Sequence, residues 1–104
     1  MEYFDSLIPG EKNVLTFNLA NGLSSGVTLS GSPTVTVSTY IGTDPSPTSI
    51  LNGSPIIDGT QTKVLVPVAV SNPFVDYLMT VLCGTTSATL TLGMPAILPV
   101  RAPS

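Results

Sequence analysis

The stretch that decides the fold is residues 62–83, which read TKVLVPVAVSNPFVDYLMTVLC. Each half of this stretch alternates with period two. The side chains that share one face are Val64, Val66, Val68 and Val70 in the first half and Tyr77, Met79, Val81 and Cys83 in the second. Because successive side chains of a strand point to opposite faces, each half is predicted to line a core with every second residue. Asn72-Pro73 supplies the turn between the two predicted strands.

The same alternation, rich in β-branched residues, recurs along the chain between short turn sequences such as Asn21-Gly22, Asp44-Pro45 and Asp58-Gly59. The predicted strands are residues 13–20, 26–30, 33–40, 55–58, 62–70, 75–83 and 87–92, followed by an extended stretch at 96–101. About seven short strands in one chain of this length are typical of an immunoglobulin-like sandwich. We therefore expect an all-β fold, a single immunoglobulin-like antiparallel β-sandwich spanning residues 1–104, with residues 1–10 and 101–104 as terminal arms.

Two residues within these strands carry more specific expectations. Tyr77 begins a long strand, where a sandwich can use a tyrosine whose ring fills the core and whose hydroxyl bonds a nearby corner. A core aromatic without a special partner is the alternative. Pro67 interrupts a strand pattern, which predicts an edge strand or a bulge at that position.

Charged residues are scarce, because they make up only 9% of the chain, and histidine is absent. The mean hydropathy is +0.45, yet the longest apolar run, Val64–Val70, is far shorter than the roughly 18 residues of a spanning helix. A chain this poor in charge is expected to cover itself with Ser and Thr or to bury outer surface against partners. The only basic residues are Lys12, Lys63 and Arg101, so we expect neither nucleic-acid nor membrane binding.

The residues needed for catalysis are also few. Without histidine the usual base near neutral pH is missing, and the six acidic residues lie in the N-terminal arm, in turns or at a strand start. Asp44 and Asp58 sit in loops where a calcium site is conceivable, but turn formation accounts for them better. Cys83 falls on the inward register and is expected to be a buried thiol. We therefore predict no enzyme activity, no metal, no cofactor and no small-molecule substrate.

The single cysteine and the absence of a recognisable secretion signal favour assembly inside the cell. If Tyr77, Met79 and Val81 face the core, the intervening leucines face outward. An outer apolar patch is then predicted, provided the strands at 62–70 and 75–83 share one sheet; its members are Leu65, Ala69, Leu78 and Leu82. An arm of the same chain could instead cover these side chains.

The N-terminal arm is unusually apolar. Its candidate contact residues are Tyr3, Phe4 and Leu7, which either pack on the chain's own sandwich or reach a neighbouring subunit.

The order of several short motifs resembles a group of small structural proteins of tailed bacteriophages encoded among head and neck genes. The motifs are Pro9-Gly10-Glu11 before Leu15-Thr16-Phe17, Gly42-Thr43-Asp44-Pro45-Ser46-Pro47 leading to Leu51-Asn52-Gly53, Asp76-Tyr77-Leu78-Met79, and Leu98-Pro99-Val100-Arg101. The resemblance runs from about residue 8 to residue 101 and implies an immunoglobulin-like virion structural protein. Leu78 and Leu82 depart from the family, whose long strand is often more polar on its outer side.

Together these observations lead us to expect a capsid decoration or cement protein that binds the major capsid protein shell and neighbouring copies of itself, located on the virion after assembly in the bacterial cytoplasm. The first alternative is a neck or head–tail joining component. A host-surface or carbohydrate-binding adhesin domain is an alternative from another class, which the low aromatic content of 6% disfavours.

Overall fold

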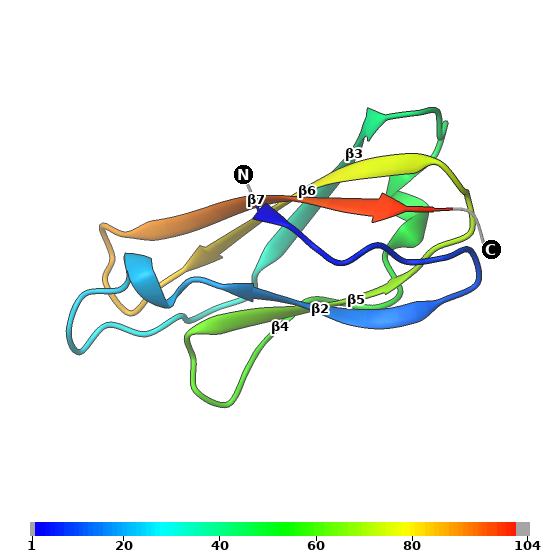
Figure 1. The fold of residues 1–104 in the computed structure, drawn as a ribbon. Coiled ribbons are helices and arrows are strands. Elements are labelled where there is room, and N and C mark those ends of the chain that lie inside the picture. The colour runs from blue at the N-terminus through cyan, green and yellow to red at the C-terminus, as the bar shows by residue number, and fades with distance from the viewer. Residues whose placement is uncertain (1, 102–104) are drawn as a thin grey trace.

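The computed structural model describes residues 2–101, and these residues form two stacked sheets (Figure 1). The four-stranded sheet has the order β1-β7-β6-β3, and the three-stranded sheet has the order β2-β5-β4. The strands are β1 (Glu2–Tyr3), β2 (Lys12–Asn18), β3 (Thr34–Ile41), β4 (Ile56–Ile57), β5 (Lys63–Ala69), β6 (Val75–Gly84) and β7 (Thr91–Val100). Two 3₁₀ turns, η1 (Ala20–Gly22) and η2 (Pro47–Ile50), lie in the connections.

The topology is immunoglobulin-like. Strands β2, β5 and β4 take the places of strands B, E and D of an immunoglobulin domain, and β3, β6 and β7 those of C, F and G. All pairs are antiparallel except that β1 lies parallel to β7 at the sheet edge. The predicted fold class, an all-β immunoglobulin-like sandwich, is confirmed.

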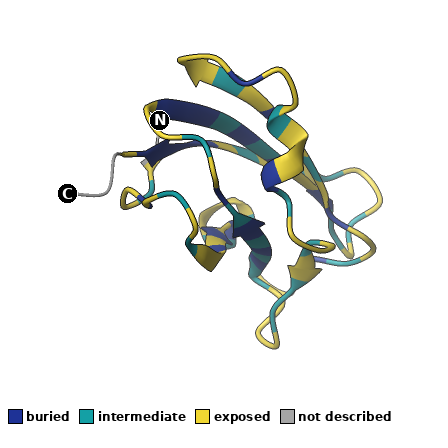
Figure 2. Cartoon of the chain, turned by 90° about the vertical axis from the view of Figure 1, so that its right-hand side faces the viewer, coloured by how far each residue is buried: buried dark blue, intermediate teal, exposed yellow. Residues whose placement is uncertain are grey.

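The core lies between the sheets, where alternate residues of the strands meet. Figure 2 shows buried residues concentrated along the strands, with exposed residues mostly in the loops and turns. The largest fully buried side chains of this core are Tyr77, Phe17, Leu29, Met79 and Leu98. Both alternating sets of residues 62–83 are buried as predicted, so period two identified the inner face correctly.

Strand β5 shows that the expectation for Pro67 was wrong. It pairs with β2 on one side and β4 on the other, so it is central in its sheet rather than an edge. The carbonyl of Pro67 accepts a hydrogen bond from Asn52 N at 3.0 Å, which shows that its backbone faces away from β2. Its missing N–H therefore removes no bond from the β2–β5 ladder, and the short β4 does not extend that far.

Other strand boundaries also differ from the prediction. Residues 26–30 form only an isolated bridge, Leu29 to Thr85, and the predicted strands at 87–92 and 96–101 are replaced by the continuous β7. Pro95 is tolerated within β7 because odd-numbered residues here direct their backbone toward β1: the carbonyls of Ile97 and Pro99 accept from Phe4 N and Leu7 N. No bond to β6 is lost.

Candidate interaction surfaces

The outer patch proposed from the sequence does not form as one surface. The prediction required the strands at 62–70 and 75–83 to share one sheet, but β5 and β6 belong to different sheets. Leu65 and Ala69 lie on the outer side of the three-stranded sheet, whereas Leu78 and Leu82 lie on the outer side of the four-stranded sheet. The alternation correctly predicted that each of these side chains points outward, but the two pairs lie on opposite sides of the sandwich.

On the four-stranded sheet the register brings an apolar row together across three strands. Tyr3 on β1 is the partner of Ile97 on β7, which is the partner of Leu78 on β6. Ile97 points away from the core yet is 0% exposed, and its register partners Tyr3 and Leu78 stand on either side of it on the same face. Tyr3 remains 61% exposed. The arm residue Tyr3 thus joins Leu78 on one surface, a connection that the sequence analysis did not foresee.

Leu82 extends this row along the strands. It is 50% exposed and lies over β7, because its Cδ2 atom occupies the space that a side chain at Gly93 would take. Exposed Pro95 stands between Leu82 and Ile97 on the same face. We call this surface the four-strand patch; its members are Tyr3, Leu78, Leu82, Pro95 and Ile97.

The three-stranded sheet carries a second apolar surface on the opposite side of the molecule. Outward register pairs join Ile56 to Leu65 and Val14 to Pro67. Val14 is 53% and Ile56 56% exposed, and both were missed from the sequence because their strands were not aligned with residues 62–70. We call this surface the three-strand patch; its members are Val14, Ile56, Leu65, Pro67 and Ala69.

The two patches differ in their charged neighbours. Lys12 pairs with Ala69 at one end of the three-strand patch, and Lys63 pairs with Asn18 at the other end. Near the four-strand patch the charges of Arg101 and Asp76 neutralise each other, with Arg101 Nη1 at 2.6 Å from Asp76 Oδ1. Lys12 therefore leaves positive charge at one end of the three-strand patch, whereas Lys63 at the other end lies near the Asp58 carboxylate. The outward positions of β6 carry no charged side chain beyond Asp76.

Most of the N-terminal segment packs on its own sandwich. The Phe4 ring meets the ring of Phe17 edge-on at a centroid distance of 5.1 Å. Leu7 is buried in the core, and it exchanges backbone bonds with Pro99 and Arg101. Phe4 and Leu7 therefore contact this chain's own sandwich, whereas Tyr3 stays exposed at the surface. Residues 102–104 of the predicted C-terminal arm lie outside the described residues.

A buried polar pair closes one end of the sandwich. The Tyr77 ring is fully buried, and its hydroxyl donates to Oδ2 of Asp44, a residue of the β3–β4 connection, at 2.6 Å. Burial, followed by this bond to Asp44, raises the pKa of Tyr77 to about 12. The pKa of Asp44 is lowered, chiefly by the Tyr77 bond and then by Ser46 N. This is the hydroxyl partner foreseen for Tyr77, supplied by a side chain of the β3–β4 connection.

The contacts of Cys83 and Asp58 are those of residues that stabilise the fold. Cys83 is buried, and burial raises the pKa of its thiol, as expected of an inert core cysteine. Asp58 accepts from Thr60 Oγ1, Thr62 N and Lys63 N within its own turn, which lowers its pKa, the Thr60 bond most of all. Within residues 2–101 no group of three His, Cys, Asp or Glu side chains converges as a metal site would require.

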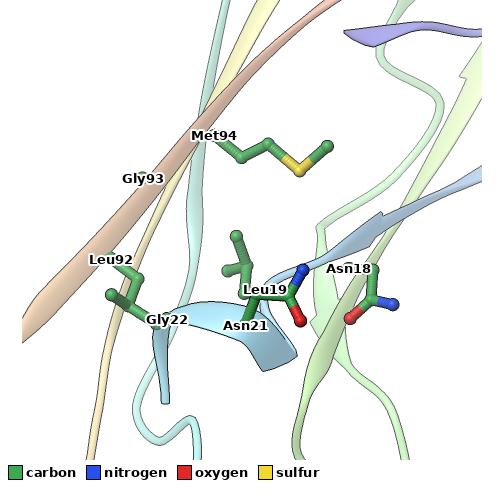
Figure 3. Close-up of a pocket in the computed structure, with 7 residues that line it drawn as sticks. All are labelled: Asn18, Leu19, Asn21, Gly22, Leu92, Gly93 and Met94. Carbon is green, nitrogen blue, oxygen red and sulfur yellow. The ribbon is translucent and has the colours of Figure 1, made fainter.

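One small pocket opens between η1 and β7 at an end of the sandwich (Figure 3). Leu19, Leu92 and Met94 supply apolar walls, and the amides of Asn18 and Asn21 lie beside them. Its remaining lining residues are glycines, Gly22 and Gly93. These groups can make van der Waals contacts and hydrogen bonds but cannot transfer protons, so the pocket offers binding chemistry only.

Three exposed apolar side chains lie where the end of β3 meets the start of β6. They are Tyr40, Ile41 and Phe74. Phe74 has a positive φ of 62°, which is uncommon for a bulky residue, and its carbonyl lies where a side chain on Gly42 would collide at 2.6 Å. Gly42 itself has φ +93°, so this close approach requires glycine at that position.

The chain matches no protein-family model and no curated protein to which it was compared. In the part of the chain that the structure describes, no helix has the length and apolar character needed to cross a membrane.

Proposed function

We propose that this chain is a structural protein of a tailed-bacteriophage particle that acts by binding other virion proteins. The observation that carries the proposal is that both outer faces of the sandwich, rather than one, carry exposed apolar side chains in register. The resemblance of the sequence motifs to small head and neck proteins supports the same class of protein.

Outer faces of antiparallel sheets are usually polar, because one side packs on the core and the other meets water. Here Leu82 and Ile56, both at least half exposed, occupy outward positions of opposite sheets. Covering apolar surface stabilises a complex by about 25 cal/mol per Å². Each patch is thus a favourable docking surface, and the molecule, 46 Å long and about 20 Å thick, can contact one partner on each side.

Two opposite patches favour a joining component, held between two neighbours in the neck or at the head–tail junction. A decoration protein is the second candidate, and the charge distribution favours it. Lys12 and Lys63 would stay hydrated on the three-stranded sheet while the uncharged four-strand patch binds the major capsid protein shell. In both cases the role is binding, and neither requires a cofactor or a catalytic residue.

The copy number in purified particles distinguishes these two positions. Quantitative mass spectrometry against the major capsid protein is expected to give roughly a dozen copies or fewer for a joining component, because axial rings contain few subunits. On the order of hundreds of copies would move the chain to the capsid surface. Absence from the particle would contradict the proposed function as a whole.

Single aspartates test each patch separately. Leu82→Asp alters the four-strand patch and Ile56→Asp the three-strand patch, and both side chains are exposed enough for the fold to survive. A joining component should lose incorporation into particles, by at least tenfold, with either variant. A decoration protein should lose it with Leu82→Asp alone.

Thr48→Asp is the matched control, since Thr48 is exposed and η2 contributes no residue to either patch. Normal incorporation of all three folded variants would show that neither patch binds a virion protein. Melting temperatures of the purified variants establish that each one is folded.

A further inference from the structure

Strand β3 forms an open edge of the four-stranded sheet. It pairs with β6 on one side, and among the described residues none makes a backbone hydrogen bond to its other side. The turn η2 packs beside β3, but its own backbone bonds go to Ser46 and Thr48. The pairing with β6 is regular from Thr34 to Thr39, and a bulge follows before Ile41. An edge of this kind is a template for another strand.

The register shows which backbone groups are free. Gly84 O accepts from Ser30 N on the β3 side, so even-numbered residues of β6 direct their backbone toward β3. Their partners on β3 are Thr34, Thr36 and Ser38, which therefore point their own backbone groups toward β6. By alternation the N–H and C=O groups directed to the open edge belong to Val35, Val37 and Thr39.

The other long edges carry a charge, a proline or a side-chain bond that blocks pairing, whereas β3 is bounded only by the turn η2 and by the bulge before Ile41. On β2, Asn13 Oδ1 accepts from Val14 N at 2.8 Å, and charged Lys12 stands at the strand start. On β7, Pro95 offers no N–H at the stretch that β1 leaves uncovered. Strands β1 and β4 are two residues each. By contrast, β3 contains neither a charged residue nor a proline, and the chain has no charged residue between Lys12 and Asp44.

We propose that two copies of this chain pair through antiparallel β3 strands about a two-fold axis at Val37. This register places Val37 opposite its own counterpart and Val35 opposite Thr39, so that all three free residues meet free groups. On the outer face it places Thr36 opposite Ser38, and every cross-strand pair is uncharged. The sequence of β3 is thus complementary to itself, which selects a second copy as the occupant. The pairing joins two four-stranded sheets into one, and it holds independently of the proposed virion role.

Amide exchange of the isolated full chain, measured at low and high protein concentration, tests this pairing. The amides of Val35, Val37 and Thr39 should slow by roughly tenfold or more as the sedimentation coefficient rises to that of a dimer. The amides of Thr34, Thr36 and Ser38 should be protected at both concentrations by their bonds to β6. A chain that stays monomeric at about 1 mM, or a dimer that leaves Val37 exchange unchanged, would overturn the proposal.

Variants then fix the edge and its register. Thr36→Lys places a charge on the edge strand at an exposed position and should abolish the dimer, whereas Thr16→Lys, equally exposed on β2, should leave it intact. Thr36→Cys with Ser38→Cys should cross-link under oxidation, because directly opposed residues of a non-hydrogen-bonded pair lie about 4.5 Å apart at Cα. Thr34→Cys with Ser38→Cys is out of register and should not. Equal cross-linking of both pairs, or a dimeric Thr36→Lys variant, would refute the register.

Discussion

Asp44 and Asp58 both lie in connections beside β4, and their pKa values are both lowered, but they are held in different ways. Asp44 is buried and its main partner is Tyr77, which is 33 positions away in the sequence. Asp58 is bonded only within its own turn, by residues no more than five positions away. The first aspartate ties a crossover between the sheets to the core strand β6, whereas the second organises a turn and nothing beyond it.

The difference separates global from local stabilisation. A carboxylate that accepts a bond from a buried hydroxyl contributes to every step that unfolds the sandwich, because the bond is lost when the sheets separate. A carboxylate that accepts bonds inside a turn can keep them while the remaining structure opens. We therefore expect substitutions at the Tyr77–Asp44 pair to lower the free energy of unfolding, and substitutions at Asp58 to act mainly on the turn.

The largest effect is expected from Tyr77→Phe. It keeps the buried ring but removes the hydroxyl that donates to Asp44, at a cost of about 1.5–3 kcal/mol for a hydrogen bond to a charged group. Denaturant unfolding measures this loss. Tyr40→Phe is the matched control, since Tyr40 is exposed, and should change stability by less than about 0.5 kcal/mol. Equal losses in the two variants would show that the buried bond contributes nothing specific.

The pH dependence of stability is expected to reflect both members of the Tyr77–Asp44 pair, Asp44 in acid and Tyr77 in alkali. The pKa of Asp44 in the folded state lies below its ordinary value of 3.8. Its contribution to the free energy of unfolding is therefore present above pH 3.8 and is lost as the pH falls through the folded pKa. The pKa of Tyr77 is raised from 10.0 to about 12, so its contribution is present below pH 10.0 and is lost as the pH rises toward 12.

Unfolding curves from pH 2 to pH 12 check this expectation. Asp44→Asn should be less stable than the wild type at pH 7, and the gap should narrow in acid below about pH 3.8. Tyr77→Phe should lack the alkaline loss. A gap between Asp44→Asn and wild type that stays constant into strong acid would show that the carboxylate charge is not what stabilises this end.

The comparison also shows what the sequence can and cannot reveal. Asp58-Gly59 and Asp44-Pro45 were both predicted as turns, because turn chemistry depends on adjacent residues. Neither residue reveals its partner, and only Tyr77 hinted at one. Alternation likewise identified the outward direction of Leu65 and Leu78 but not their sheets, because period two is the same in both. Which strands are neighbours depends on contacts between distant residues, so the four-strand patch, with buried Ile97 at its centre, emerged only from the register.

The smallest effect is expected from Thr60→Ala, which removes the hydroxyl that donates to the Asp58 carboxylate. Because Asp58 still accepts from Thr62 N and Lys63 N, the melting temperature should fall less than in Tyr77→Phe. The exchange of the Thr62 and Lys63 amides should nevertheless accelerate, since the carboxylate that accepts from them is held less firmly. Faster exchange confined to this turn would establish Asp58 as a local element. If the amides of β6 accelerate to the same extent, the turn is coupled to the core, and the contrast between the two aspartates does not hold.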